Sequence, residues 1–469
     1  MNLWSQWYLC VQDFQAACSR PRTYLYLVLV LVGFSIRPEC AGVTSFIRAV
    51  FLDPRLYPGL LHFFNSSTGL DLSSLTQIWC GLVHRMFPVL QVGAYDVYVA
   101  DGLKVAKEGK KMPGVKKLHQ ASENNSKAPY IMGHSFQVLA LLVGAVGGSV
   151  AAVPLISRIH EGLVWFTGDR RSLLDKLAAM LLQTVSRDSR PALLVADAYY
   201  ASRKVIGPLL QAGHQVLTRV RKNAVAYQAA PIPKTARRGR PKKYGKKIAL
   251  RKYFDQLEKF IPAMSPVYGE TDTPIWYRTE VLLWRPIGRL VRFVWVIHPT
   301  RGRMILMCTD TSLDPLKGIE TYGYRFKIEV SFRHAIQGIG PYAYHFWMKA
   351  MKPIRRREGK QYLHKKSETY RKAVKRKMEA YHRFVQLGCI AQGLLQYLSL
   401  VHGKEVWAQF RSWLRTMKTD NPPSELVVSY ALRSSLFEFL VNVPPDHNLK
   451  KIITENMTVQ QMEEYQMAA

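Results

Sequence analysis

Two short apolar runs, each followed directly by an aspartate, constrain the fold of this chain most. The sequence VYVA precedes Asp101, and LLVA precedes Asp197. Fully apolar strands this short are typically buried on both faces, in the centre of a sheet. Open α/β sheets bind their ligands where such strands end. We therefore predict an α/β core in which the two strands are neighbours and present both carboxylates at one edge.

The patterns along the rest of the chain divide it into four parts. Val138–Ile156 carries no charge, but its valines and its Gly147-Gly148-Ser149 turn predict two buried strands rather than a membrane helix. The predicted parts are a helical N-terminal region for DNA binding or dimerisation (1–90), an α/β catalytic core (91–221 and 300–350), a β-rich insertion with a basic loop (222–299), and a basic helical C-terminal region (351–469).

The charge balance predicts a polyanionic partner. The chain has 66 Lys and Arg against 33 Asp and Glu, a net charge of +33. Nucleic acid is the commonest partner of so basic a protein, although the same net charge would also suit binding to an acidic membrane surface. The six cysteines are scattered without a CxxC pair, which favours reduced thiols over a zinc module or disulfides.

A third carboxylate lies in the segment YGYRFKIEVSFR. On a helix, Tyr322, Arg325 and Glu329 are spaced i, i+3, i+7 and share one face. The guanidinium can grip a phosphate in bidentate fashion, and the phenol can hydrogen-bond to a DNA backbone. A surface Arg–Glu pair is the simpler reading, but it leaves Tyr322 unexplained. Three carboxylates together predict a site for Mg²⁺ or Mn²⁺, which prefer oxygen ligands.

These three segments resemble those of DDE transposases from bacterial insertion sequences. The Tyr-x2-Arg-x3-Glu motif ends in RFKIEVSFRHA, while YVADGLKVAKEGKKMPGVKKLHQ and LLVADAYYASRKVI are similar to the family's first and second aspartate segments. The resemblance implies an RNase H-like core whose catalytic metal ligands are Asp101, Asp197 and Glu329, holding two Mg²⁺ or Mn²⁺ ions. The family's lysine would fall at Ile336, a departure that puts that DNA contact in doubt.

The resemblance also implies an activity and partners. We expect cut-and-paste transposition, in which element ends are hydrolysed and then joined to target DNA. The partners would be double-stranded DNA (terminal inverted repeats and target) and a second copy of the chain, in a bacterial cytoplasm at the nucleoid, with no membrane. Two alternatives remain open: an RNase H-like nuclease without strand transfer, and a decayed or domesticated DNA-binding protein that does not cut.

Basic segments around the carboxylates are candidate DNA contacts. The stretch from 349 to 383 holds 14 Lys and Arg against three Glu, and we expect it to form a helix along a phosphate backbone. The strip RRGRPKK at 237–243 is suited either to the minor groove or to a solvated loop. We assign His134 no role and read Trp284 and Trp295 as strand packing. The predicted contacts are Tyr322, Arg325, Arg333, Lys104, Lys107, Arg238 and Arg240.

Overall fold

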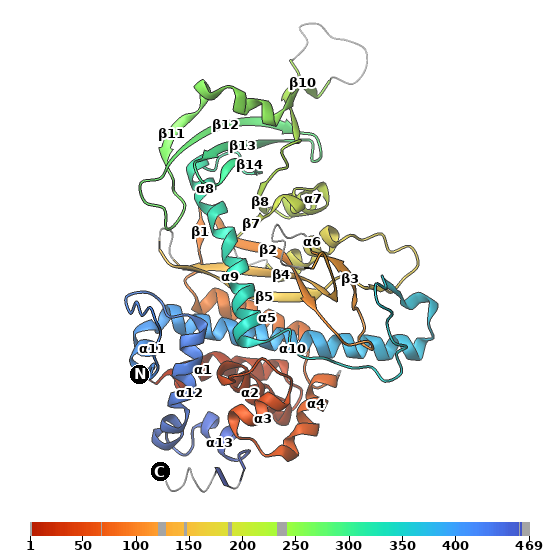
Figure 1. Ribbon diagram of the computed structural model, residues 1–469, viewed down its shortest axis with the longest axis vertical. Coiled ribbons are helices and arrows are strands. Elements are labelled where there is room, and N and C mark those ends of the chain that lie inside the picture. The colour runs from red at the N-terminus through yellow and green to blue at the C-terminus, as the bar shows by residue number, and fades with distance from the viewer. Residues whose placement is uncertain are drawn as a thin grey trace.

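The computed structural model has a large mixed sheet with helices from both ends of the chain packed beneath it (Figure 1). It describes residues 2–66, 68–120, 128–144, 148–185, 190–231, 242–458 and 460–461. The fold is therefore of the α/β class, with a mostly-sheet core and helical regions at both ends, as the sequence predicts.

Five strands form the centre of the sheet, in the order β5-β4-β2-β7-β8. β4 runs antiparallel to both β2 and β5, whereas β7 runs parallel to β2 and β8. Parallel neighbours need crossover connections, and the helices α6 and α7 provide them. The bounds are β2 (Tyr95–Ala106), β4 (Tyr130–Gly144), β5 (Val150–Ile159), β7 (Ala192–Ala196), β8 (Gln215–Arg219), α6 (Leu173–Thr184) and α7 (Arg203–Gln211).

The charge-free stretch folds as the predicted pair of strands. β4 and β5 are antiparallel and largely buried, with Gly144 opposite Val150. Gly144 has a φ of +117°, and a Cβ there would lie 2.1 Å from the Ser149 carbonyl oxygen, so only glycine fits. Part of the turn itself, residues 145–147, lies outside the described residues.

The insertion continues the sheet instead of forming a separate layer. β14 pairs antiparallel with β8 and with β13, so the sheet extends outward from the core. Trp295 is fully buried and donates to the Leu250 carbonyl at 2.8 Å, and Trp284 is 6% exposed. Strand packing thus accounts for both tryptophans. The strands are β9 (Val225–Ala229), β10 (Tyr244–Ala249), β11 (Ile261–Met264), β12 (Pro274–Trp284), β13 (Arg289–His298) and β14 (Gly302–Cys308).

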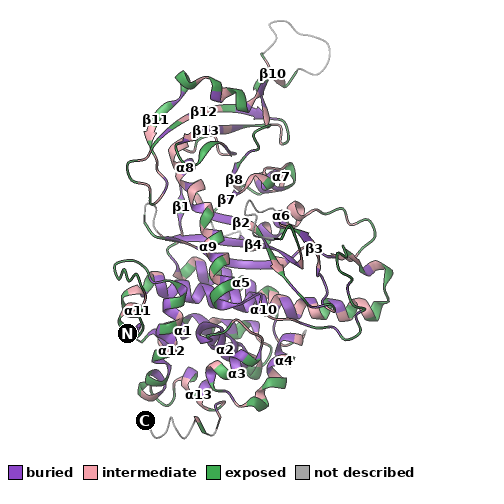
Figure 2. Ribbon diagram, in the orientation of Figure 1, coloured by how far each residue is buried: buried purple, intermediate pink, exposed green. Residues whose placement is uncertain are grey.

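The helices of both chain ends pack around one long helix, α10 (Glu368–Val401), which also contacts β5. Of the described helices, α10 alone is long and apolar enough to cross a membrane, but 89% of its apolar window is buried within the protein (Figure 2). It is a core helix. Its neighbours include α1 (Leu3–Val11), α2 (Pro21–Ile36), α4 (Tyr57–Asn65), α5 (Leu72–Met86), α11 (Gly403–Gln409) and α12 (Glu425–Asn442).

The prediction of one basic helix over residues 349–383 is wrong in its first half. Residues 349–366 are mostly irregular, with only the short strand β15 (Gln361–Tyr362) and one 3₁₀ turn. The helix begins at Glu368, after Ser367 caps it by accepting from the Tyr370 amide. Arg383 is buried and donates to the Phe64 carbonyl, so this cation does not face solvent.

Candidate active site

Asp101 and Asp197 stand at matching positions on neighbouring parallel strands. β2 and β7 pair with Val99 opposite Val195, and each aspartate follows its valine by two residues. Residues in register on parallel strands project to the same side of the sheet. The two carboxylates therefore lie side by side, as predicted, but only Asp197 follows the end of its strand. The predicted strand end at Asp101 is wrong, because β2 continues to Ala106 and stays paired with β4 over that length.

Local hydrogen bonds hold each aspartate. Asp197 Oδ1 accepts from the Tyr199 amide at 2.9 Å and caps a short 3₁₀ turn, while its carbonyl accepts from the Thr218 hydroxyl at 2.8 Å. Asp101 Oδ1 accepts from the Gly102 amide at 2.7 Å. Turn capping is common for an aspartate that follows a strand and accounts for the contacts of Asp197.

The third carboxylate comes from the helical segment after the insertion. α8 (Pro315–Gly323) passes through a 3₁₀ turn into α9 (Lys327–His334), which carries Glu329. Arg325 lies in that turn and contacts two carboxylates. Its Nη1 is 3.3 Å from Asp101 Oδ2, and its Nη2 donates to Glu329 Oε1 at 2.6 Å. Arg325 thus links the first predicted ligand to the third.

The charges of both other acids act on the Asp101 carboxyl. Burial raises its pKa to about 6, and the negative charges of Asp197 and Glu329 raise it further, against the Gly102 amide and Arg325, which lower it. Like charges gathered in a partly buried site disfavour ionisation. The negative charges of Asp197 and Glu329 therefore act on Asp101, and the positive charge of Arg325 offsets them only in part.

Two tyrosines complete the surroundings. Tyr322 is partly buried, and this burial raises its pKa; the charges of Arg325 and Arg219 lower the pKa, and that of Asp197 raises it. Tyr200, which the sequence analysis missed, is 2% exposed. Burial raises its pKa, and the charges of both Asp101 and Asp197 add to the rise. Its position three residues after Asp197 was the available signal.

The three carboxylates are suitable ligands for a metal ion, but in their present spacing two of them bind the Arg325 guanidinium instead. Carboxylate oxygens are the ligands that Mg²⁺ and Mn²⁺ prefer. Among the described residues, no three His, Cys, Asp or Glu side chains converge closely enough to hold one ion. Arg325 instead contacts both Asp101 and Glu329. A metal bound by all three carboxylates would therefore compete with Arg325.

The predicted DNA contacts are placed unevenly. Lys104 is exposed and donates to the His119 carbonyl at 2.6 Å, and Arg333 is exposed beside Gln337. Lys107 does not fit the prediction, because it is 3% exposed and its ammonium donates to the backbone carbonyl of Tyr342. Arg238 and Arg240 lie outside the described residues.

Ile336, at the position of the expected lysine, is 45% exposed in the helical stretch that follows α9. His134 is buried and bonds to the Pro113 carbonyl oxygen at 2.9 Å, consistent with a structural role.

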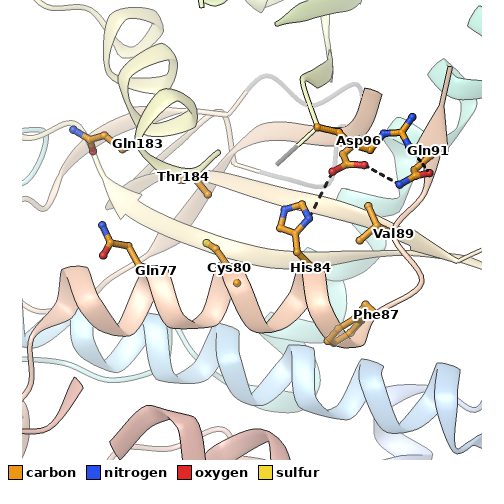
Figure 3. A pocket seen from close by; sticks show the side chains of 11 residues that line it. Gln77, Cys80, His84, Phe87, Val89, Gln91, Asp96, Gln183 and Thr184 are labelled. Carbon is orange, nitrogen blue, oxygen red and sulfur yellow. Dashed lines mark hydrogen bonds and ion pairs between the residues drawn. The ribbon is translucent and has the colours of Figure 1, made fainter. Parts of the chain in front are cut away.

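A cavity of about 790 Å³ lies at the other end of β2 (Figure 3). Its wall includes Asp96, whose carboxylate is 3.6 Å from His84 Nδ1, while His84 Nε2 is 2.9 Å from the Tyr98 hydroxyl. Asp96 and Asp101 are an odd number of residues apart on one strand, so their side chains face opposite sides of the sheet. This cavity is separate from the three carboxylates.

A family comparison bears on the same segment of the chain. Residues 167–339 match the transposase DDE domain. The match includes Asp197, Arg325 and Glu329, and Asp101 precedes it. It supports a transposase of the DDE type, a class that acts on DNA and generally uses divalent metal ions. No curated protein matches the chain.

Proposed function

We propose that this protein is a DNA transposase that cuts the ends of a mobile element and joins them to target DNA. One observation carries the proposal: Arg325 bridges the carboxylates of Asp101 and Glu329, Asp197 follows the strand paired with β2, and all of these residues except Asp101 lie in the segment that matches a transposase domain. The strand arrangement, with Asp101 within β2 and Asp197 directly after the adjacent parallel strand β7, supports an RNase H-like core of an insertion-sequence enzyme.

Asp101, Asp197 and Glu329 would hold Mg²⁺ or Mn²⁺, as two ions. Bound there, the metals supply activation of the attacking oxygen and charge stabilisation of the leaving one. Arg325 is then free to turn its guanidinium from the carboxylates to a phosphate, which it can bind in bidentate fashion. Tyr322, packed beside Arg325, orients that guanidinium and offers its hydroxyl to the backbone.

The same residues serve both chemical steps. In the first step water attacks the phosphodiester at an element end and releases a 3′-hydroxyl. In the second step that hydroxyl attacks a target phosphodiester, so only the attacking oxygen changes. Two ends must be handled together, and we propose a homodimer in a complex with terminal inverted repeats and target DNA, in the cytoplasm.

The DNA would lie across a basic surface that two segments build together. The Lys110 carbonyl accepts from the Ile354 amide at 2.7 Å, and the Glu358 carbonyl accepts from the Lys117 amide at 2.9 Å. These bonds bring the residues after Asp101 against the irregular basic stretch before α10. The exposed cations include Lys104, Lys110, Lys349, Lys352, Arg355, Arg356, Arg357 and Lys360.

A DNA-binding protein that does not cut is the second candidate. Two features favour it: Ile336 replaces the family's lysine, and Arg325 ties Asp101 to Glu329. In such a protein the guanidinium would be a permanent structural counter-ion.

The test uses the full chain, Mg²⁺ or Mn²⁺, and DNA that carries the sequences flanking its coding region. We expect cleavage and joining, both lost in Asp197→Asn with DNA binding retained. Asp310→Asn is the matched control, because Asp310 also follows a strand and caps a turn, accepting from the Ser312 amide at 2.8 Å. It lies near Tyr95, at the opposite end of the sheet, so cleavage should persist.

The outcomes separate the candidates. Cleavage that survives Asp197→Asn excludes the proposed site. Cleavage without joining indicates a nuclease, and binding without cleavage indicates the non-cutting protein.

A further inference from the structure

A second basic feature adjoins the three carboxylates on the side of the insertion. It is a hollow of about 540 Å³ where the end of β8, the 3₁₀ turn Leu250–Asp255 and the start of β14 meet. Five cations line it, and we call it the basic hollow: Arg219, Lys222, Arg251, Lys252 and Arg303.

Strand register ties the basic hollow to the active site. β7 and β8 are parallel with Ala196 opposite Thr218, so Arg219 holds the position on β8 that Asp197 holds on β7. Asp101 holds the same position on β2. The positive charge of Arg219 also reaches Tyr322 and lowers the pKa of that phenol, although burial raises it overall. The hollow therefore begins beside the reacting centre.

The cations of the hollow lack acidic partners. Asp255 is the only carboxylate in its lining, and within the described ranges none of the five forms an ion pair. Nearby cations behave differently: Arg301 pairs with Glu270 at 2.6 Å, and Lys317 pairs with Glu320 at 2.9 Å. The hollow thus concentrates five positive charges against the single negative charge of Asp255.

The floor of the hollow is apolar and buried. Val220, Phe254 and Ile305 are each at most 7% exposed, and the Arg303 guanidinium lies 5.4 Å from the centre of the Phe254 ring. The five cations themselves are all exposed. A chain of phosphates would meet several of them at once, and the volume exceeds what a single phosphate ion needs.

We propose that the basic hollow binds the phosphodiester backbone of the DNA strand next to the scissile phosphate. This inference rests on the proposed function, because it assigns the path by which a DNA strand leaves the three carboxylates. The insertion is then part of the substrate-binding surface, with Arg219 nearest to the cut and Lys222, Arg251 and Lys252 farther along the strand.

The test is the salt dependence of DNA binding, measured by fluorescence anisotropy with a labelled duplex in a chelating buffer, so that no cleavage occurs. Lys222→Gln/Lys252→Gln removes two exposed side chains that make no described hydrogen bond or ion pair. Each lost phosphate contact makes the slope of log K against log salt shallower by about 0.9, so we expect a change of about 1.8. Lys222→Arg/Lys252→Arg keeps the charges and should restore the slope.

The control is Arg285→Gln/Arg289→Gln, which removes the same charge from the same insertion. These exposed arginines lie at the far end of β13 from Arg303, since Arg289 pairs with Trp284 and Ile297 with Arg303. A slope change no larger in the test variant than in the control overturns the inference while leaving the transposase proposal intact. If the unsubstituted chain binds no DNA even at low salt, the proposed function fails instead.

Discussion

Asp101→Asn should stabilise the protein while removing its activity. In the folded chain burial raises the pKa of Asp101 from 3.8 to about 6, helped by the charges of Asp197 and Glu329. The favourable effect of Arg325 is already contained in that value. The asparagine keeps the shape of the side chain and removes the negative charge. The variant therefore avoids the free-energy cost of holding an ionised carboxylate at this position in the folded state.

The magnitude follows from linkage. A pKa difference of about 2 corresponds to about 3 kcal/mol, at about 1.4 kcal/mol per pKa unit, and the 23% exposure of the side chain reduces it toward about 2 kcal/mol. Because the folded pKa lies above the unfolded one, wild-type stability falls as pH rises from about 4 through 6. The advantage of Asp101→Asn should therefore be absent below pH 4, partial at pH 5 and complete above pH 7.

Urea denaturation at several pH values, in a chelating buffer, measures this. Asp310→Asn is an informative control, because hydrogen bonds from Ser312 and Tyr95 lower the Asp310 pKa even though burial opposes them. That variant should lose stability at pH 8 and approach the wild type on acidification. Equal stability of Asp101→Asn and wild type at pH 8, or an advantage that does not vary with pH, would refute the raised pKa of Asp101 and with it the burial and neighbouring charges that cause it.

Substitutions at three further positions test the packing of the fold. Burial lowers the pKa of Lys107 to about 7. The fold therefore loses stability as pH falls, because the unfolded chain binds the proton of this amine more readily than the folded chain does. Relative to the wild type, Lys107→Met should be more stable by at least about 2 kcal/mol more at pH 6 than at pH 9 in urea denaturation. It should leave the salt slope of DNA binding unchanged. A Cβ on Gly393 would lie 2.2 Å from Trp79, so Gly393→Ala should destabilise by about 1–3 kcal/mol in thermal unfolding. Gly81→Ala, with nothing within 4 Å, should instead stabilise by up to about 1 kcal/mol; equal effects would contradict the close packing of α10.

Local sequence predicted both central strands but only one of the two strand ends, because β7 ends directly before Asp197 whereas β2 continues past Asp101 to Ala106. The runs before Asp101 and Asp197 are short, apolar and buried, and burial on both faces leaves them only the centre of a sheet. The helical spacing of Tyr322, Arg325 and Glu329 likewise survives the 3₁₀ turn that interrupts the segment.

Features that depend on tertiary contacts were missed. Lys107 has the same basic neighbours in sequence as Lys104, yet its ammonium is buried against backbone carbonyls supplied by a segment more than two hundred residues away. Arg219 reads as an ordinary basic residue after a strand, and only the register of β8 against β7 brings it beside Asp197. Charge counts could not distinguish buried, paired and free cations.

The helices of the two chain ends hold α9, which carries Glu329, and the stretch that follows it. Gln392 of α10 donates to the Ser331 carbonyl at 2.9 Å, two residues beyond Glu329. Arg37, buried at the end of α2, donates to the carbonyls of Ile339 and Gly340 at 2.6 and 3.0 Å. Buried donors of this kind are costly to leave unpaired, so these bonds hold the helical segment in one position. Under the proposed function, the helices of both terminal regions would therefore position the third carboxylate through these bonds to α9 and the stretch that follows it.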